Sequence, residues 1–460
     1  MSSTRFVNSG VLLFIDSLVV AASGWIYWIM ISKLTTSSEI GQATTIFSLV
    51  TVVAGLTQLG LEYPLLKKTT IDRSKILGTA LVIELLITMA SIPIMLFVVN
   101  DIFHESFKDF VVVAIVLLIL APAGFVPRFA LLGVSRVRTI LLADVIGIGI
   151  RFISGYVLVT MSLGAQGILW SYLLSSLAVT GATMIIAAKS LGVTIGSIGY
   201  LKELARDGLA NTPAKLSRML VLSLSVVLLS SFGLDDSSIG IFYIALMVSV
   251  VAGGLAASIA FMVLPASTTS KTDLSTQSAR IGLSLTAPLI AGLMVSPSSV
   301  LALIGPEYVS ASTTLFILSI AIFPTSIVYN AISKFNNLNK QKQLITIGSV
   351  EIAIFLIAFW ILVPLYGTAG AALSILVSFS ASAVVSIIWS ERILLRYIAT
   401  SVIAIILGWL PGYTLAAFLD LDRGICIILA IVISLATVLV FKNTSTSEMA
   451  QFLKMMVARK

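Results

Sequence analysis

Apolar runs of about 20 residues, separated by short polar breaks, follow one another along nearly the whole chain. A helix that rises 1.5 Å per residue needs about 20 apolar residues to cross a hydrocarbon core of roughly 30 Å. The pattern therefore predicts an all-α polytopic membrane protein with about fourteen transmembrane helices. The predicted spans are 8–32, 40–65, 76–99, 109–133, 139–160, 166–188, 213–232, 239–265, 281–303, 311–333, 344–365, 369–390, 397–419 and 425–441.

The composition excludes a water-soluble domain. The 460 residues are 58% hydrophobic and 10% charged, and the mean hydropathy is +1.11, far outside the soluble range. The first apolar run has full spanning length and lacks a convincing cleavage site, so we expect it to be a permanent span and not a signal peptide. One cysteine, Cys426, permits no internal disulfide, and one histidine, His104, makes no metal cluster. We therefore expect no metal and no cofactor.

The basic residues predict the orientation, because Lys and Arg in short loops stay on the cytoplasmic side. With the N-terminus inside, most of the 28 Lys and Arg residues fall in cytoplasmic loops. Acids such as Asp101 and Glu307 then fall in external loops. Both termini are thus predicted to be cytoplasmic. The net charge of +8 reflects this topology and an attraction to anionic lipid headgroups, so no nucleic-acid partner is expected.

The chain repeats itself at nearly constant spacing. GAQGILWSYLL at 164–174 corresponds to GTAGAALSILV at 367–377, and SLVTVVAGL at 48–56 corresponds to MVSVVAGGL at 247–255. The matches predict two pseudo-symmetric six-helix lobes related by an axis along the membrane normal, with a substrate site between them. The predicted parts are an N-lobe (1–190), an interfacial linker helix (191–212), a C-lobe (213–395), helices 13 and 14 (396–441) and a cytoplasmic amphipathic tail (442–460). Asn211, Thr212 and Pro213 predict a helix cap and the start of span seven.

Four stretches carry a resemblance to a known family: SLGAQGILWSYLL at 162–174, SSIGIFYIALMV at 237–248, LIGPEYVSASTTLFILSIAIFP at 303–324 and LVPLYGTAGAALSILV at 362–377. In order and spacing they resemble the polysaccharide transporter or O-antigen (Wzx-type) flippase family of the multidrug/oligosaccharidyl-lipid/polysaccharide (MOP) exporter superfamily. The resemblance covers nearly the whole chain.

This resemblance implies a V-shaped fold of two six-helix bundles with two extra C-terminal helices. It also implies a function: moving an oligosaccharide linked to polyprenyl phosphate or pyrophosphate across the cytoplasmic membrane of a prokaryote, by alternating access. The partners expected are that lipid-linked substrate, membrane lipids, a coupling proton or sodium ion, and glycan-assembly enzymes.

One arginine lies deep in a predicted span. In DVIGIGIRFISGY at 144–156, a helical period puts small and polar residues on one face, with mostly branched apolar residues around the rest. The residues of this stripe are Asp144, Gly147, Arg151, Ser154 and Gly155. Arg151 is about 18 Å from the cytoplasmic end of the span, near the midplane. Exposing it to lipid there costs at least about 2.5–3.5 kcal/mol. It either pairs with an acid and fixes packing, or lines a cavity and binds the carrier-lipid phosphate with paired donors.

Other charges in spans are weaker candidates. Three further cations are candidate substrate ligands: Arg128, Lys215 and Arg218. Four acids are candidate ion-coupling residues, because a buried carboxylate carries a proton, coordinates sodium or pairs with a basic partner: Asp16, Glu84, Asp144 and Glu351. Asp16 is the first choice only by resemblance, since related exporters often place a coupling acid in their first helix.

Three classes of function compete. A lipid-linked oligosaccharide flippase agrees with the cationic residues. The alternative is a multidrug or cation antiporter of the same superfamily, which would favour acidic or aromatic groups around a cationic substrate. An enzyme is not expected, because the external loops have about ten residues or fewer and no cluster of nucleophile, base and orienting group is visible.

Overall fold

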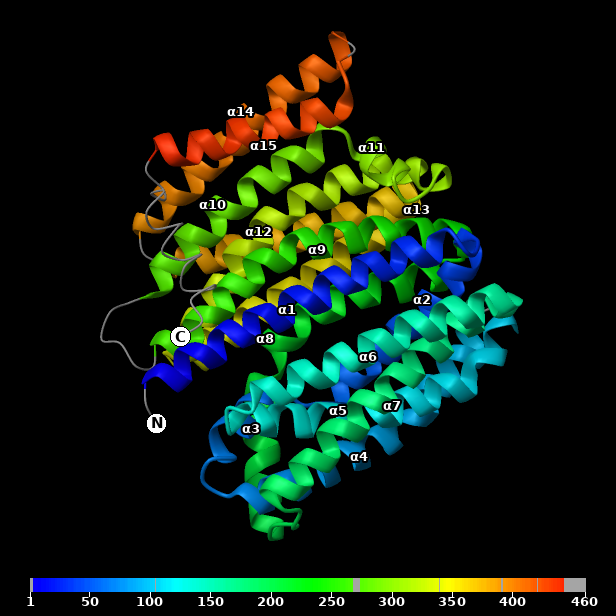
Figure 1. The fold of residues 1–460 in the computed structure, drawn as a ribbon, viewed down its shortest axis with the longest axis vertical. Coiled ribbons are helices and arrows are strands. Elements are labelled where there is room, and N and C mark those ends of the chain that lie inside the picture. The colour runs from blue at the N-terminus through cyan, green and yellow to red at the C-terminus, as the bar shows by residue number, and fades with distance from the viewer. Residues whose placement is uncertain are drawn as a thin grey trace. The chain divides into compact units, whose positions relative to one another are not determined.

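A computed structural model describes residues 3–103, 105–267, 274–338, 340–389, 392–419 and 421–441. Within these residues the regular structure is entirely helical, and Figure 1 labels the α-helices. The α-helices are α1 (Ser3–Ser32), α2 (Ser37–Thr57), α3 (Glu62–Lys68), α4 (Arg73–Phe97), α5 (Val111–Gly133), α6 (Val137–Leu158), α7 (Gly164–Leu191), α8 (Ile198–Ser231), α9 (Asp236–Ser267), α10 (Leu274–Val295), α11 (Pro297–Ala302), α12 (Ser312–Asn337), α13 (Gln341–Ile388), α14 (Arg392–Phe418) and α15 (Arg423–Val440). Short π- or 3₁₀-helical segments are η1 (Val98–Ile102), η2 (Glu105–Phe110), η3 (Val159–Leu163) and η4 (Pro306–Ala311).

The helices agree with a protein that crosses the membrane many times. Among the described residues, nine helical stretches are long and apolar enough to cross a membrane, and three shorter apolar helices accompany them. Two of the nine, Val137–Leu191 and Gln341–Ile388, each cover two predicted spans. Each predicted span overlaps one or more helices, with a break at 58–61 inside span 40–65 and at Ser296 inside span 281–303. The all-α polytopic fold is confirmed. The count of fourteen stays a prediction.

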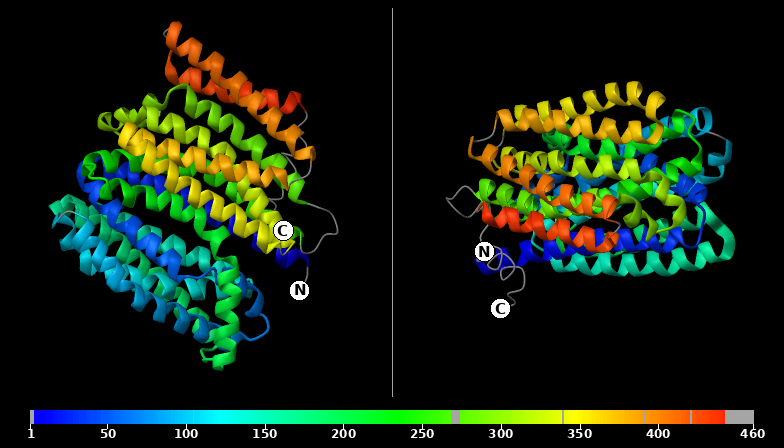
Figure 2. Two further views of the ribbon diagram at one scale, coloured as in Figure 1. Left: turned by 180° about the vertical axis from the view of Figure 1, so that it is seen from behind. Right: turned by 90° about the horizontal axis from the view of Figure 1, so that it is seen from above.

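The helices pack into two compact units, which we call the N unit (Ile26–Tyr243 with Gln341–Ile352) and the C unit (Met1–Trp25, Ile244–Lys340 and Ala353–Lys460). In the N unit, α6 lies along α7 and α5 also packs on α7. In the C unit, α14 and α15 lie side by side in every view and pack on α10 (Figures 1 and 2). The predicted lobe boundaries at residues 190 and 213 stay a prediction, because these units follow spatial packing and not the sequence repeat.

The repeat is visible in the backbone. Gly164 and its counterpart Gly367 both have left-handed φ, +48° and +56°, with ψ near −127° and −129°, a conformation that glycine adopts without a steric penalty. Each reverses the chain between two long helices. Gly167 and Gly370 then pass close to the end of the preceding helix, where a Cβ would lie 3.0 Å from the Leu158 carbonyl carbon and 2.6 Å from that of Leu362.

The predicted cap at residues 211–213 is wrong. Helix α8 runs from Ile198 to Ser231 without a break, so the linker helix and span seven are one helix. It is capped instead at Ser197, whose side chain accepts a hydrogen bond from the Tyr200 N–H. Thr212 keeps to the helical pattern, since its hydroxyl donates to the Gly208 carbonyl one turn earlier. The predicted amphipathic tail (442–460) lies outside the described residues.

Candidate functional site

Helix α6 turns its polar stripe toward its neighbours. Asp144, Gly147 and Gly155 are buried, whereas Ile146 and Ile153 on the other side are 57% and 69% exposed. A Cβ on Gly147 would collide with the Val179 side chain of α7, and Ser175 of α7 donates a 2.8 Å hydrogen bond to the Gly147 carbonyl. The small residues of the stripe therefore allow α6 and α7 to pack closely.

Arg151 lies between two tyrosine rings. The guanidinium carbon of Arg151 is 5.0 Å from the ring centre of Tyr27 in α1 and 5.2 Å from that of Tyr172 in α7. Both distances are within the range of a cation–π interaction. The guanidinium is thus contacted by rings from two other helices, α1 and α7, which lie far apart in the sequence.

Tyr27 is fixed from two sides. Its ring is fully buried, and its hydroxyl shares a 2.6 Å hydrogen bond with Ser171. Gly155, one turn after Arg151, makes room for it, because a Cβ there would lie 2.8 Å from Tyr27 Cε2. The ring that holds Arg151 therefore depends on a glycine of the same helix.

Further aromatic rings surround Tyr27 and Tyr172. Tyr27 makes edge-on contacts with Trp28, Phe152 and Tyr172 at centroid distances of 5.6, 5.7 and 5.6 Å. Trp28 in turn contacts Tyr243 at 5.0 Å, and Phe47 contacts Tyr172 at 4.5 Å. We call this group the aromatic cluster: Tyr27, Trp28, Phe47, Phe152, Tyr172 and Tyr243. All its members belong to the N unit.

The aromatic cluster suits a cation that must keep its charge. Ring faces attract a guanidinium through their quadrupole and carry no formal charge, so they stabilise Arg151 without cancelling it. The rings occupy only part of the surface of the guanidinium, so its remaining N–H groups are the donors with which arginine binds phosphate. Arg151 is about 10 Å along α6 from Leu158 and about 20 Å from Val137, well inside the helix.

Arg128 of α5, a candidate substrate ligand, and Asp144 of α6, a candidate coupling acid, form an ion pair. One Arg128 nitrogen, Nη1, lies 2.8 Å from Oδ1 and 2.6 Å from Oδ2 of Asp144. The Arg128 side chain is 31% exposed and that of Asp144 is 9% exposed. The structure thus joins a predicted substrate ligand to a predicted coupling acid. Asp144 lies about 10 Å from Arg151 along the helix axis, so these two form separate polar positions.

The remaining predicted residues are spread over both units. Glu84 in α4 and Glu351 in α13 are fully buried in the N unit, and Asp16 in α1 is 3% exposed in the C unit. The side chains of Lys215 and Arg218 lie outside the described part of the chain. Among the described residues, no group of three or more His, Cys, Asp or Glu residues could hold a metal ion.

Sequence reasoning missed the aromatic partners and one further arginine. Tyr27 and Trp28 lie near the end of the first span, where aromatic residues are common, so they gave no signal of a site. Arg280 lies just outside the predicted span 281–303. Helix α10 begins earlier, at Leu274, and the Arg280 guanidinium carbon lies 6.0 Å from the ring centre of Tyr397 in the C unit.

Comparisons with known proteins identify the fold. No protein-family model and no curated protein matches the sequence. Among solved structures, the lipid II flippase MurJ in an inward closed conformation has a TM-score of 0.72 at 14% identity, covering 97% of this chain and all of that one. A MATE transporter in complex with MaD5 has a TM-score of 0.60 at 16% identity, covering 85% of this chain and 97% of that one. A MOP superfamily transporter from Pyrococcus furiosus has a TM-score of 0.55 at 16% identity, covering 85% of this chain and 96% of that one. The chain therefore has the fold of the MOP superfamily flippases and transporters, as the sequence resemblance predicted.

Proposed function

We propose that this protein is a flippase that moves a lipid-linked oligosaccharide, carried on polyprenyl phosphate or pyrophosphate, across the cytoplasmic membrane of a prokaryote. The observation that carries the proposal is Arg151, held between the rings of Tyr27 and Tyr172 within the membrane-spanning helices. The MOP fold supports it, since the fold occurs both in a lipid II flippase and in MATE transporters.

The chemistry of Arg151 favours an anionic headgroup. The substrate of a lipid-linked sugar flippase carries phosphate, and a hydrogen bond between a charged donor and phosphate contributes about 1.5–3 kcal/mol. In this proposal Arg151 binds the phosphate while the sugar crosses through a hydrated path and the lipid tail remains in the bilayer. The fold then alternates access between the two sides of the membrane.

Multidrug or cation transport is the competing function, because MATE transporters share the fold. An aromatic cluster is a common binding site for an organic cation. Here two ring faces are already occupied by Arg151, whose charge would repel such a substrate. This arrangement supports the flippase over the antiporter.

Transport against a gradient needs an energy source, and we propose a proton or sodium ion. The buried carboxylates Asp16, Glu84 and Glu351 are the coupling candidates. Asp144 is a fourth candidate, although its pairing with Arg128 gives it a structural role as well. Membrane lipids and glycan-assembly enzymes are the other proposed partners, with both termini on the cytoplasmic side.

A complementation experiment tests the proposal. The wild type, Arg151→Ala, Arg151→Lys and the control Arg138→Ala are expressed in a strain that lacks its own flippase for surface glycans. Arg138 is a suitable control because it is an exposed arginine at the start of the same helix. Surface polymer, accumulated lipid-linked precursor and the membrane abundance of each variant are measured.

We expect the wild type and Arg138→Ala to restore surface polymer. Loss of one charged hydrogen bond weakens phosphate binding by about 10- to 150-fold, so Arg151→Ala should accumulate precursor and Arg151→Lys should be partly active. Equal restoration by Arg151→Ala would refute the phosphate role of Arg151. Failure of the wild type, together with efflux of organic cations by the same protein, would refute the flippase and favour the antiporter.

A further inference from the structure

The chain between α7 and α8 is tied to the start of α4. The Thr194 N–H donates a 2.9 Å hydrogen bond to the Ser74 carbonyl, and the Gly196 N–H donates a 2.8 Å hydrogen bond to the Thr79 hydroxyl. Gly78 permits this contact, because a Cβ at that position would collide with the Thr194 carbonyl. The connection is therefore held in place by its backbone.

This fixed connection presents apolar side chains outward. Ile195 and Ile198 are 65% and 75% exposed, and Ile71, which precedes α4, is 73% exposed. The opposite side of α8 differs, since Leu204 is fully buried among residues of α3, α4, α5 and α7. We call the exposed group the isoleucine patch: Ile71, Val193, Ile195 and Ile198.

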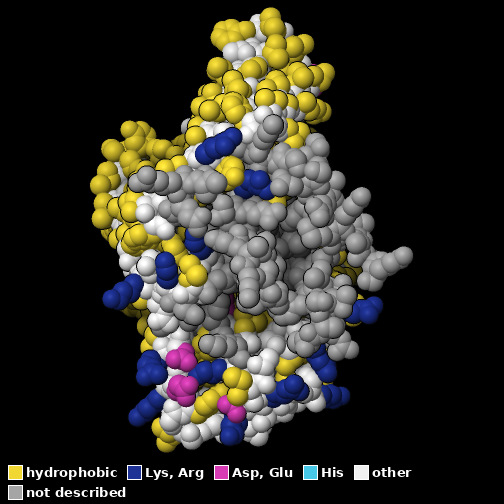
Figure 3. Space-filling view, turned by 90° about the vertical axis from the view of Figure 1, so that its left-hand side faces the viewer, with side chains coloured by type: hydrophobic (Ala, Val, Ile, Leu, Met, Phe, Trp, Pro, Cys, Tyr) yellow, Lys and Arg dark blue, Asp and Glu magenta, His cyan; other side chains and the backbone are white. Residues whose placement is uncertain are grey.

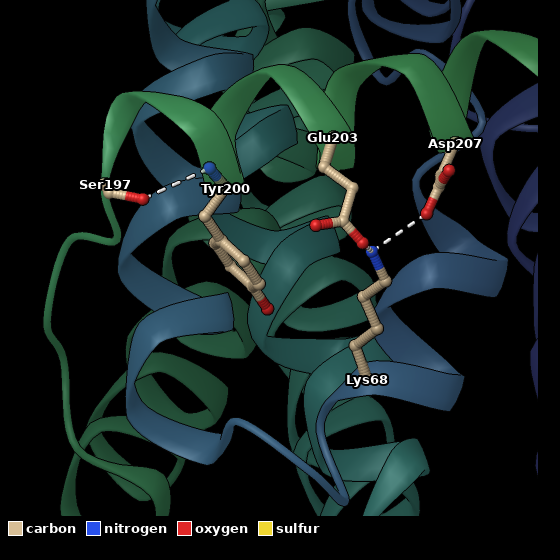
Figure 4. A network of polar contacts seen from close by, with 5 residues as sticks. All are labelled: Lys68, Ser197, Tyr200, Glu203 and Asp207. Carbon is tan, nitrogen blue, oxygen red and sulfur yellow. Dashed lines mark hydrogen bonds and ion pairs between the residues drawn. The ribbon is translucent and has the colours of Figure 1, made fainter.

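The acids of α8 near the patch are engaged by one lysine. Lys68 Nζ lies 2.7 Å from Glu203 Oε1 and 2.8 Å from Asp207 Oδ2, as Figure 4 shows. Burial by itself would lower the pKa of Lys68, but the hydrogen bonds and charges of Asp207 and Glu203 outweigh it and raise that pKa. Lys68 therefore stays charged and offsets part of the negative charge of α8.

The exposed charges around the isoleucine patch are mainly basic. Lys and Arg side chains gather on the lower part of the face in Figure 3, which carries the ends of the N-unit helices, with a few acidic ones among them. The exposed basic residues of α4, the end of α7 and the start of α8 are Arg73, Lys75, Lys189, Lys202 and Arg206. A basic surface with outward isoleucines matches an anionic layer with an apolar layer beneath it.

We propose that the isoleucine patch and its basic residues form a docking surface for anionic phospholipid headgroups of the leaflet in which α4 begins. The patch lies where α4 begins and α7 ends, and the ends of membrane-spanning helices lie at the headgroup layer. The isoleucines enter the apolar side of that layer, while Lys202 and Arg206 bind phosphate groups. This surface anchors the start of α8 to the membrane, and the inference does not depend on which substrate the protein moves.

Lipid quenching at residue 198 tests the proposal. Cys426 is the only cysteine and is buried, so an Ile198→Cys variant carries a fluorophore at one accessible position, with labelled wild type as background. The protein is placed in nanodiscs that contain brominated phosphatidylglycerol or brominated phosphatidylcholine at equal mole fraction. We expect stronger quenching by the anionic lipid.

Removing the basic residues should remove this preference. Lys202→Gln with Arg206→Gln should lower the preference for the anionic lipid by up to about 5-fold per charge. The control Lys340→Gln with Lys342→Gln removes two exposed charges from another segment and should leave the preference unchanged. Equal quenching by both lipids, no quenching by either, or an equal effect of the control would each overturn the proposal.

Discussion

Replacing Gly155 with alanine tests whether the position of Tyr27 controls the Arg151 site. The new Cβ would lie 2.8 Å from Tyr27 Cε2 and 2.9 Å from its hydroxyl, closer than atoms pack in proteins. The ring is fully buried, so it can move only by giving up its hydrogen bond to Ser171. Overpacking of this kind costs about 1–3 kcal/mol, and the lost hydrogen bond about 1 kcal/mol more.

Alanine at a helical position also gains about 1 kcal/mol over glycine, so we expect Gly155→Ala to lower the free energy of unfolding by about 1–3 kcal/mol in total. Displacing Tyr27 also removes a cation–π contact of about 0.5–2 kcal/mol, which would weaken substrate binding by about 2- to 30-fold. Denaturation by SDS in mixed micelles measures the first quantity, and flipping of a fluorescent lipid-linked sugar in liposomes measures the second.

Gly149 provides the matched control for this experiment. It lies on the same helix, and a Cβ there would meet no atom within 4 Å. Alanine favours a helix over glycine by about 1 kcal/mol, so Gly149→Ala should be as stable as the wild type or slightly more stable. If Gly155→Ala and Gly149→Ala behaved alike in both assays, the reasoning about Tyr27 would be refuted.

Three further predictions concern the rest of the N unit and the repeat. Arg128→Gln leaves the Asp144 carboxylate without its ion pair and should cost roughly 3 kcal/mol of unfolding free energy, while the double variant with Asp144→Asn should cost less than the sum of the single changes. Additive effects in the SDS titration would contradict this. Gly370→Ala should destabilise more than Gly167→Ala, because its Cβ would lie 2.6 Å, instead of 3.0 Å, from the carbonyl carbon of the preceding helix; the reverse order would be inconsistent with this packing. Because the folded-state pKa of Lys68 is raised above 10.5, its contribution is fully present below that pH and is lost as the pH rises through the raised value. The opening free energy of residues 198–208, obtained from hydrogen exchange after correction for the intrinsic rate, should therefore be constant from about pH 6 to 10. It should be lower in Lys68→Met. Unaltered protection in that variant would show that the ion pairs do not hold α8.

Local sequence patterns were enough to predict the helical spans, the repeat and the inward stripe of α6. These features depend on local properties, since hydrophobic length decides what crosses a membrane and a period of 3.6 residues decides which side chains share a face. Gly164 and Gly367 were predicted as a repeated pair, and both adopt the same left-handed turn. Sequence pattern also placed Arg151 on the stripe that faces other helices.

Which side chains contact one another across helices could not be predicted from these patterns and depends on the packing of the whole fold. Arg151 contacts Tyr27, more than a hundred positions earlier in the chain, and Arg128 forms an ion pair with Asp144 of the next helix. Such partners depend on how helices pack in space, and aromatic residues have no periodic signal that distinguishes a cation–π partner from an ordinary interior ring. The start of helix α8 is a second example, because Leu204 there is buried against other helices. An amphipathic pattern by itself does not distinguish a face that packs on protein from a face that lies on lipid.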